Sequence, residues 1–297
     1  MKKLVSAIAA VIAVGVAGGA GAQTLDKIKK DGAITIGHRD ASIPFSYFDD
    51  KQQPIGYSMD ICMKIADAVK AELKLPNLKV NLNPVTSATR IPLMANGTID
   101  LECGSTTNNI ERQKQVAFAP TTFVTANRLA AKKSANITKL DDMKGKALVS
   151  TSGTTNIKQV TELNGSKGLG MNIMAAKDHA EAFLMIETGR AVAFAMDDIL
   201  LYSLIASSKA PADYMVTSEA LSVEPYGIMM RKDDPTFKKV VDTAVMNLMK
   251  SGELDKIYAK WFTSPIPPKG INLNLPMTAA LKKVVAAPTD SGDPAKY

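Results

Sequence analysis

Three arginines stand at positions where an α/β protein could use them to bind an anion. Arg39, Arg90 and Arg112 each follow a predicted strand or open a predicted helix, and the chain has only 6 arginines among its 36 basic residues. Arginine presents a planar fork of donors that suits a carboxylate, whereas dispersed lysines are typical of a solvated surface. One such arginine alone would suggest a surface ion pair. Three together indicate a cleft, because ligands of open α/β sheets bind beyond the carboxyl ends of the strands.

One predicted helix start adds backbone donors to this cleft. In STSGTTN (150–156) a strand, a glycine turn and a helix follow one another directly. The N–H groups near Thr154 and Thr155 then point outward at the positive end of the helix dipole, which suits a carboxylate. Ordinary helix capping would explain this start equally well.

A second helix start adds side chains. In TSATRIPLM (86–94), Pro92 belongs in the first helical turn, so the helix begins near Thr89. Ser87 and Arg90 then lie at its mouth, although capping is again an equal alternative.

Signatures of catalysis and of metal binding are missing from the sequence. It contains no G-x-S-x-G elbow, no phosphate-binding loop, no H-E-x-x-H and no C-x-x-C. The histidines His38 and His179 are far apart, and neither has metal-ligand spacing to a partner. We therefore expect no metal and no cofactor.

Strands alternate with helices along the chain, which predicts parallel βαβ units and an α/β fold. Ser58 is predicted to cap a helix with an apolar residue at every fourth position (Ile61, Ile65, Val69, Leu73). The predicted strands are 33–37, 79–85, 99–104, 128–133, 147–151, 171–176, 191–196 and 226–232, and further helices are predicted at 154–163, 178–187, 235–250 and 252–262. Regular structure is predicted to end at 264–270, leaving the segment APTDSGDPAKY loose.

The N-terminal segment has the layout of a cleavable export signal. Residues 1–22 combine two lysines, an apolar stretch and small residues before the expected cleavage, so the mature chain should start near Gln23. Without Lys2 and Lys3 the formal charge of +7 falls by two to +5. This charge is dispersed and aromatic residues make up only 5% of the chain, which argues against nucleic-acid binding. We expect a soluble, exported protein.

The two cysteines, Cys62 and Cys103, are an even number in an oxidising compartment. A disulfide between a helix and a strand end is as compatible with the sequence as two buried thiols.

Six segments together resemble the glutamate/aspartate periplasmic binding proteins of ABC transporters, and the run ECGSTTNNIERQKQ is specific to that subgroup. The segments are 37–49, 86–118, 145–156, 176–183, 189–198 and 226–239. The resemblance implies a type II periplasmic binding protein: two α/β lobes, each a mostly parallel sheet flanked by helices, with two hinge crossovers near 125–128 and 218–224. The implied domains are a signal peptide (1–22), lobe 1 (23–125 and 221–270), lobe 2 (126–220) and a C-terminal extension (271–297).

The resemblance also implies a role for each of nine residues. Arg112 and Thr155 would bind the ligand α-carboxylate; Ser105, Thr107 and Asp197 the α-ammonium; and Arg39, Ser87, Arg90 and His179 the side-chain carboxylate. How Ser105, Thr106 and Thr107 share their contacts stays open.

A charge count favours an acidic ligand independently. The backbone of an amino acid needs one cation and one anion, which Arg112 and Asp197 supply. Arg39 and Arg90, with His179 as donor or cation, are then surplus, and buried charges need partners.

The sequence thus predicts a monomeric periplasmic component of an ABC importer that binds L-glutamate or L-aspartate and delivers it to a membrane permease. The alternatives are a binder of another polar amino acid, a receptor partner, and an enzyme resembling the cyclohexadienyl dehydratases with Asp197 as its acid or base.

Overall fold

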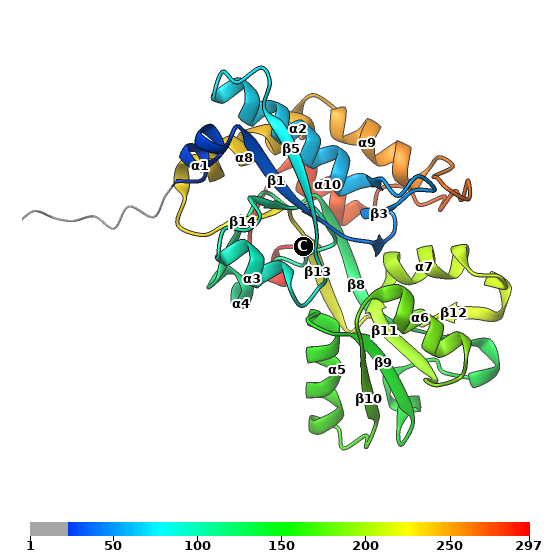
Figure 1. The fold of residues 1–297 in the computed structure, drawn as a ribbon. Helices are drawn as coiled ribbons and strands as arrows, with labels where there is room; N and C mark the ends of the chain where they lie inside the picture. Colours follow the sequence, from blue (N-terminus) through cyan, green and yellow to red (C-terminus); the bar gives the residue numbers. More distant parts are fainter. Residues whose placement is uncertain (1–22) are drawn as a thin grey trace, which may run out of the picture.

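The computed structural model describes residues 23–297, and the expected signal peptide lies outside them. The chain folds into two α/β lobes joined by a pair of strands (Figure 1). Residues 23–297 include no helix whose length and apolar character would let it cross a bilayer.

The first lobe is built on a five-stranded sheet of order β5-β1-β6-β14-β7, in which β14 runs antiparallel to both neighbours. Its strands are β1 (Ala33–His38), β5 (Lys79–Pro84), β6 (Leu101–Glu102), β7 (Val116–Phe118) and β14 (Met229–Arg231). Beside it lies a small sheet of β2 (Ala41–Ser42), β3 (Ser46–Phe48) and β4 (Pro54–Ile55). The helices of this part are α1 (Thr24–Asp31), α2 (Tyr57–Glu72), α3 (Arg90–Ala95), α4 (Ile110–Gln113), α8 (Pro235–Lys250), α9 (Glu253–Phe262) and α10 (Ala279–Ala286).

The second lobe has a six-stranded mixed sheet of order β10-β9-β11-β8-β12, with β13 also paired to β8. Its strands are β8 (Phe123–Lys132), β9 (Ala147–Thr151), β10 (Asn172–Ala176), β11 (Ala193–Asp197), β12 (Tyr214–Val216) and β13 (Ser222–Tyr226). The helices are α5 (Thr155–Ser166), α6 (His179–Glu187) and α7 (Asp198–Ser207). All five residues of β11 are buried, as expected for a strand inside a sheet covered on both faces.

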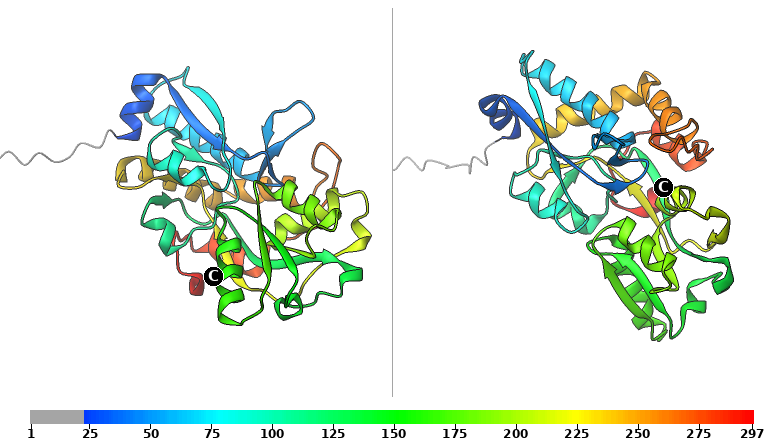
Figure 2. Two further views of the ribbon diagram at one scale, coloured as in Figure 1. Left: turned by 60° about the horizontal axis from the view of Figure 1, so that its bottom comes forward. Right: turned by 45° about the vertical axis from the view of Figure 1, so that its right-hand side comes forward.

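The strands β8 and β13 form the connection between the lobes. They pair antiparallel from Phe123 opposite Tyr226 to Asn127 opposite Ser222. Figure 1 labels both strands where they pass between the lobes, and Figure 2 shows the same connection from two other directions. On the first-lobe side, the Phe123 ring stacks on Phe262 with centroids 4.9 Å apart. This aromatic packing anchors the start of β8. The domain boundaries expected near these strands remain predictions.

The structure confirms the α/β class and most predicted elements, and it corrects three details. The helix predicted to be capped by Ser58 is capped instead by Gly56, and the Ser58 hydroxyl donates to the carbonyl of Gly104 at 2.8 Å. The segment after residue 270 contains α10, which the prediction missed. Residues 287–297, predicted to be loose, are held by hydrogen bonds to the first lobe.

The open question about the cysteines is answered by a disulfide. Cys62 in α2 is bonded to Cys103 directly after β6, with their Cα atoms 6.2 Å apart. The bond therefore ties a helix of the first lobe to the strand end that leads into the polar segment 104–112.

Candidate functional site

The nine predicted site residues all lie at the carboxyl ends of strands, three strands in each lobe. Arg39 follows β1; Ser87 and Arg90 follow β5; Ser105, Thr107 and Arg112 follow β6; Thr155 follows β9; His179 follows β10; and Asp197 ends β11. Because the carboxyl ends of parallel strands meet at one edge of a sheet, the fold brings these residues to the facing edges of the two lobes.

A small cavity between the lobes is lined by seven of the nine. They are Ser87, Arg90, Ser105, Thr107, Thr155, His179 and Asp197. Thr154, from the predicted helix start, also lines the cavity, as do Asn156, Met196 and Leu200, which the sequence did not single out. Thr106 is absent from this lining, and its hydroxyl accepts from Arg90 and donates to Glu102.

The lobes touch beside this cavity. Gly153 precedes α5 with φ +75°, and a Cβ built on it would lie only 2.5 Å from the Cα of Ala88 in the first lobe. The guanidinium of Arg112 also reaches the carbonyl of Gly153 at 3.4 Å. A residue with a side chain at this position would hold the lobes apart.

Donors gather at one end of the site. The Arg39 Nη2 atom donates to Ser87 Oγ at 2.8 Å, and His179 Nδ1 lies 2.8 Å from Thr151 Oγ1. Arg39 Nη1 and His179 Nε2 are buried and have no hydrogen-bond partner within residues 23–297. Arg39 Nη1 is therefore a donor without a partner, and the role of His179 Nε2 follows from the tautomer that the contact with Thr151 selects.

Burial and nearby positive charges lower the pKa values of basic groups in the site. Burial, followed by the charge of Arg90, lowers the pKa of Arg39 to about 10 and that of Arg112 to about 9, so both stay cationic at neutral pH. Burial together with Arg39 and Arg90 holds the pKa of His179 well below its usual value. In this arrangement the imidazole is thus neutral at neutral pH, and His179 acts as a hydrogen-bonding group.

A buried carboxylate that the sequence reasoning missed supports the arginines. Arg90 Nη1 donates to Thr106 Oγ1 at 2.6 Å, and the Thr106 hydroxyl in turn donates to Glu102. Glu102 is fully buried, and its charge favours the protonated forms of Arg39, Arg90 and Arg112. An acidic residue at every second position of the predicted strand IDLEC, Asp100 and Glu102, was the signal for it.

Carboxylates gather at another part of the site. Asp197 accepts hydrogen bonds from Asn156 Nδ2 at 2.7 Å and from the Tyr226 hydroxyl. Burial and then the nearby charge of Glu224 raise the pKa of Asp197 to about 7. With Glu102 and Glu224 both buried here, the sequence-based charge count was incomplete, because it included Asp197 as the only anion.

The segment carrying Arg112 contacts this acidic part. Arg112 Nη1 donates to the carbonyl of Thr107 at 2.7 Å, and the Asn109 side chain accepts from the Arg112 amide at 2.8 Å. The Thr155 hydroxyl donates to Glu224 at 2.9 Å, so its proton is already committed and the amide remains its free donor toward a ligand.

The arrangement suits the binding of a small ligand with charges of both signs. Its donors and carboxylates come from both lobes, so a ligand placed between them would contact both. Nowhere in residues 23–297 do three or more His, Cys, Asp or Glu side chains form a group that could hold a metal ion.

Comparisons with known proteins agree with this geometry. The chain is 58% identical over 268 residues to an L-glutamate/L-aspartate-binding protein of Pseudomonas aeruginosa, covering 90% of this chain and 89% of the relative. It is 48% identical over 271 residues to the glutamate/aspartate import solute-binding protein of Escherichia coli, covering 91% and 90%. A substrate-binding protein of an ABC uptake transporter from Streptococcus pneumoniae, solved with bound histidine, superposes with a TM-score of 0.71 at 26% identity, covering 81% of this chain and 96% of that one.

Residues 34–264 match the model of a single protein family, described as bacterial extracellular solute-binding proteins, family 3. This match spans both lobes and all nine predicted site residues, and the chain belongs to that family.

Proposed function

We propose that this protein is the substrate-binding component of an ABC importer, that it binds L-glutamate or L-aspartate between its lobes, and that it delivers the ligand to a membrane permease. Residues 1–22 would direct export to the periplasm, where the protein would act as a monomer. The support is the family membership together with the names of the two relatives at 58% and 48% identity.

The residue roles follow the charges around the cavity. Arg112 and the amide of Thr155 would bind the α-carboxylate, and Ser105, Thr107 and Asp197 would bind the α-ammonium. Arg39, Ser87, Arg90 and His179 would bind the side-chain carboxylate.

One observation carries the preference for an acidic ligand: Arg39 Nη1 is a buried donor without a partner, and His179 Nε2 would be a second donor beside it if Nδ1 accepts from the Thr151 hydroxyl. A ligand carboxylate brings only acceptors to these donors, whereas a side-chain amide also brings an NH₂ group that would face the guanidiniums. With Glu102 and Glu224 present, the net charge alone does not select the ligand. The position of the donors supplies the selectivity.

The enzyme alternative receives no support from the relatives. Both are named as solute-binding proteins. Asp197, the acid or base that a dehydratase would need, has the ligand ammonium as its partner in this proposal. A binder of another polar amino acid remains an outcome that the test below separates.

The experiment is calorimetric titration of ligand-stripped protein with glutamate, aspartate, glutamine and arginine. We expect tight binding of the two acidic amino acids and much weaker binding of the others. Equal affinity for glutamate and glutamine would overturn the assignment of Arg39 and Arg90, and turnover of prephenate or arogenate would favour the enzyme.

Two variants separate the two carboxylate sites. Arg112→Ala should lower the affinity for every amino acid by about 30-fold or more. Arg90→Ala should lower the glutamate-to-glutamine affinity ratio by about the same factor. Both magnitudes follow because truncating a buried charged partner costs about 2–5 kcal/mol. The ratio is measured within one variant, so a general loss of stability cancels. Arg190→Ala is the control, because Arg190 is exposed. Equal losses for both ligands in Arg90→Ala would contradict the assigned role.

A further inference from the structure

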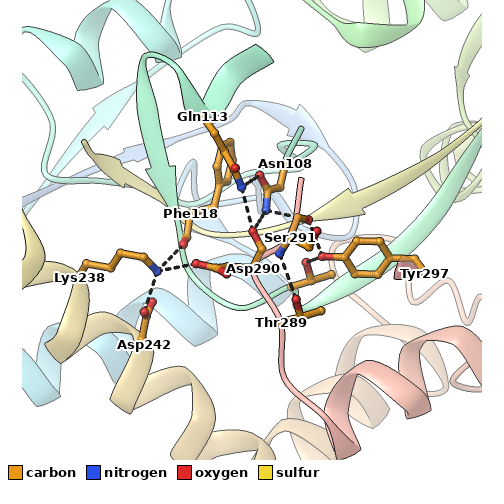
Figure 3. A network of polar contacts seen from close by, with 10 residues as sticks. Asn108, Gln113, Phe118, Lys238, Asp242, Thr289, Asp290, Ser291 and Tyr297 are labelled. Carbon is orange, nitrogen blue, oxygen red and sulfur yellow. Dashed lines mark hydrogen bonds and ion pairs between the residues drawn. The ribbon is translucent and has the colours of Figure 1, made fainter. Parts of the chain in front are cut away.

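The segment 287–297, here called the strap, lies against the backbone that carries Arg112. The carbonyl of Asp290 accepts hydrogen bonds from Asn108 Nδ2 and from Gln113 Nε2, both at 2.8 Å, and Gln113 Nε2 also donates to Asn108 Oδ1 at 2.8 Å (Figure 3). One strap carbonyl therefore joins Asn108, which precedes α4, to Gln113, the last residue of α4.

The strap also approaches α4 too closely for a side chain. A Cβ built on Gly292 would lie 2.6 Å from the amide nitrogen of Ile110 and 2.7 Å from the carbonyl carbon of Asn109. Asn109 is the residue whose side chain caps the amide of Arg112. Backbone thus packs on backbone at the start of the helix that contains Arg112.

The strap is itself anchored to the rigid part of the first lobe. Lys238 of α8 forms an ion pair with Asp290 at 2.8 Å, and the amide of Thr121, next to the start of β8, donates to the carbonyl of Thr289 at 2.8 Å. The Tyr297 hydroxyl donates to the carbonyl of Ser291 at 2.7 Å and lies 2.8 Å from Thr121 Oγ1 (Figure 3). These contacts fix the strap relative to α8 and to the hinge.

Such support is needed because α4 is a single turn. A helix of four residues is not stable by itself, since it forms too few hydrogen bonds to offset the conformational entropy lost in ordering its first turn. The amide of Asn108 donates to the carbonyl of Pro225 in β13 at 2.7 Å, which holds the segment from the hinge side. The strap holds the same segment from the outside.

We propose that the strap is a positioning element for Arg112, and that it sets the affinity for every amino-acid ligand without setting selectivity. The proposal rests on the proposed function, in which Arg112 binds the α-carboxylate common to all such ligands. The selective groups Arg39, Ser87, Arg90 and His179 belong to other segments, and within residues 23–297 their side-chain hydrogen bonds go to residues outside the strap.

Gly292→Ala tests this directly, because it adds one methyl group against Asn109 and Ile110. We expect the dissociation constants for glutamate and for aspartate to rise by the same factor, at least about fivefold, with their ratio unchanged. Gly165→Ala is the matched control, because a Cβ on Gly165 meets nothing within 4 Å. A chain truncated after Ala286, the last residue of α10, removes the whole strap and should show a larger effect in the same direction.

Hydrogen exchange in the ligand-free protein provides a readout that does not depend on binding. The amides of residues 108–113 should exchange faster in Gly292→Ala than in the wild type or in Gly165→Ala. Unchanged exchange and unchanged affinity would overturn the proposal, and so would lower global stability with unchanged affinity. If the wild type binds no amino acid, the proposed function fails while the exchange data still test the strap. If the truncated chain does not fold, Gly292→Ala decides alone.

Discussion

Replacing Gly153 with alanine should show how much contact between the lobes contributes to ligand binding. The substitution has two consequences, one that is present whether or not the lobes touch and one that is present only when they do. The backbone at this position stays at φ +75°, a left-handed conformation that costs a residue with a Cβ about 1–2 kcal/mol whether or not the lobes touch. The methyl group would also lie 2.5 Å from the Cα of Ala88, and this clash exists only when the lobes are in contact.

The second consequence sets the loss of affinity. Overpacking of this kind costs about 1–3 kcal/mol, which corresponds to a dissociation constant raised about 5- to 150-fold. The first consequence should appear only as a lower free energy of unfolding, because it is the same in the ligand-free and ligand-bound protein.

Gly189→Ala is the control that separates the two. Gly189 has φ +74°, and a Cβ on it meets nothing within 4 Å, so it shares the backbone cost and lacks the clash. Calorimetric titration with glutamate and urea denaturation of both variants provide the assay. Similar stability losses with an affinity loss confined to Gly153→Ala are expected. Equal affinities in the two variants would refute the claim that lobe contact at Gly153 contributes to binding.

Three further predictions concern groups around the site. Because burial and Glu224 raise the pKa of Asp197 to about 7, a bound ligand ammonium should displace its proton. Affinity for glutamate should therefore rise by up to about tenfold per pH unit as the pH increases toward 7, and then level off. Calorimetry in buffers of different ionisation enthalpy would detect the released proton. An affinity that does not change with pH would contradict this. Thr151→Val should raise the dissociation constant for glutamate by about tenfold. The reason is that the Thr151 hydroxyl would donate to Nδ1 of His179 and so keep the proton on Nε2, the nitrogen proposed to donate to the ligand. Wild-type affinity in this variant would exclude the role. Replacing Cys62 and Cys103 by serine opens a loop closed across 41 residues and should lower the free energy of unfolding by about 4 kcal/mol, measured by urea denaturation; an unchanged midpoint would count against a disulfide in solution.

Part of the candidate site could be predicted from local sequence because it depends on a local rule. Arg39, Arg90 and Arg112 follow strands or open helices that the sequence pattern predicts. The roles of Ser105, Thr107, His179 and Asp197 come only from the family resemblance. Pro92 placed the start of α3, and the structure indeed has Thr89 as its N-cap. The helix from Pro235 to Lys250 has the predicted bounds because its apolar periodicity and its proline start agree.

The residues that were missed depend on contacts between distant parts of the chain. Glu224 influences Asp197 only because β13 returns beside the second lobe, and a sequence pattern contains no information about that approach. The strap has a polar composition rich in turn formers, yet Asn108 holds Asp290 across 182 positions. The composition of residues 287–297 predicts a loose segment, but hydrogen bonds to distant residues of the first lobe hold it in place.

Glu102 explains how the first lobe can hold three buried arginines before any ligand is present. Burial and then the charge of Arg90 lower the pKa of Arg39 and that of Arg112, and without a buried anion the lobe would have to bury like charges together. The charge of Glu102 acts in the opposite direction on all three arginines and offsets part of that repulsion. Since the carboxylate of Asp197 lies in the other lobe, a zwitterionic ligand with the proposed partners would meet both of them only when the lobes touch. The proposed residue roles therefore predict that ligand binding and lobe contact at Gly153 are coupled.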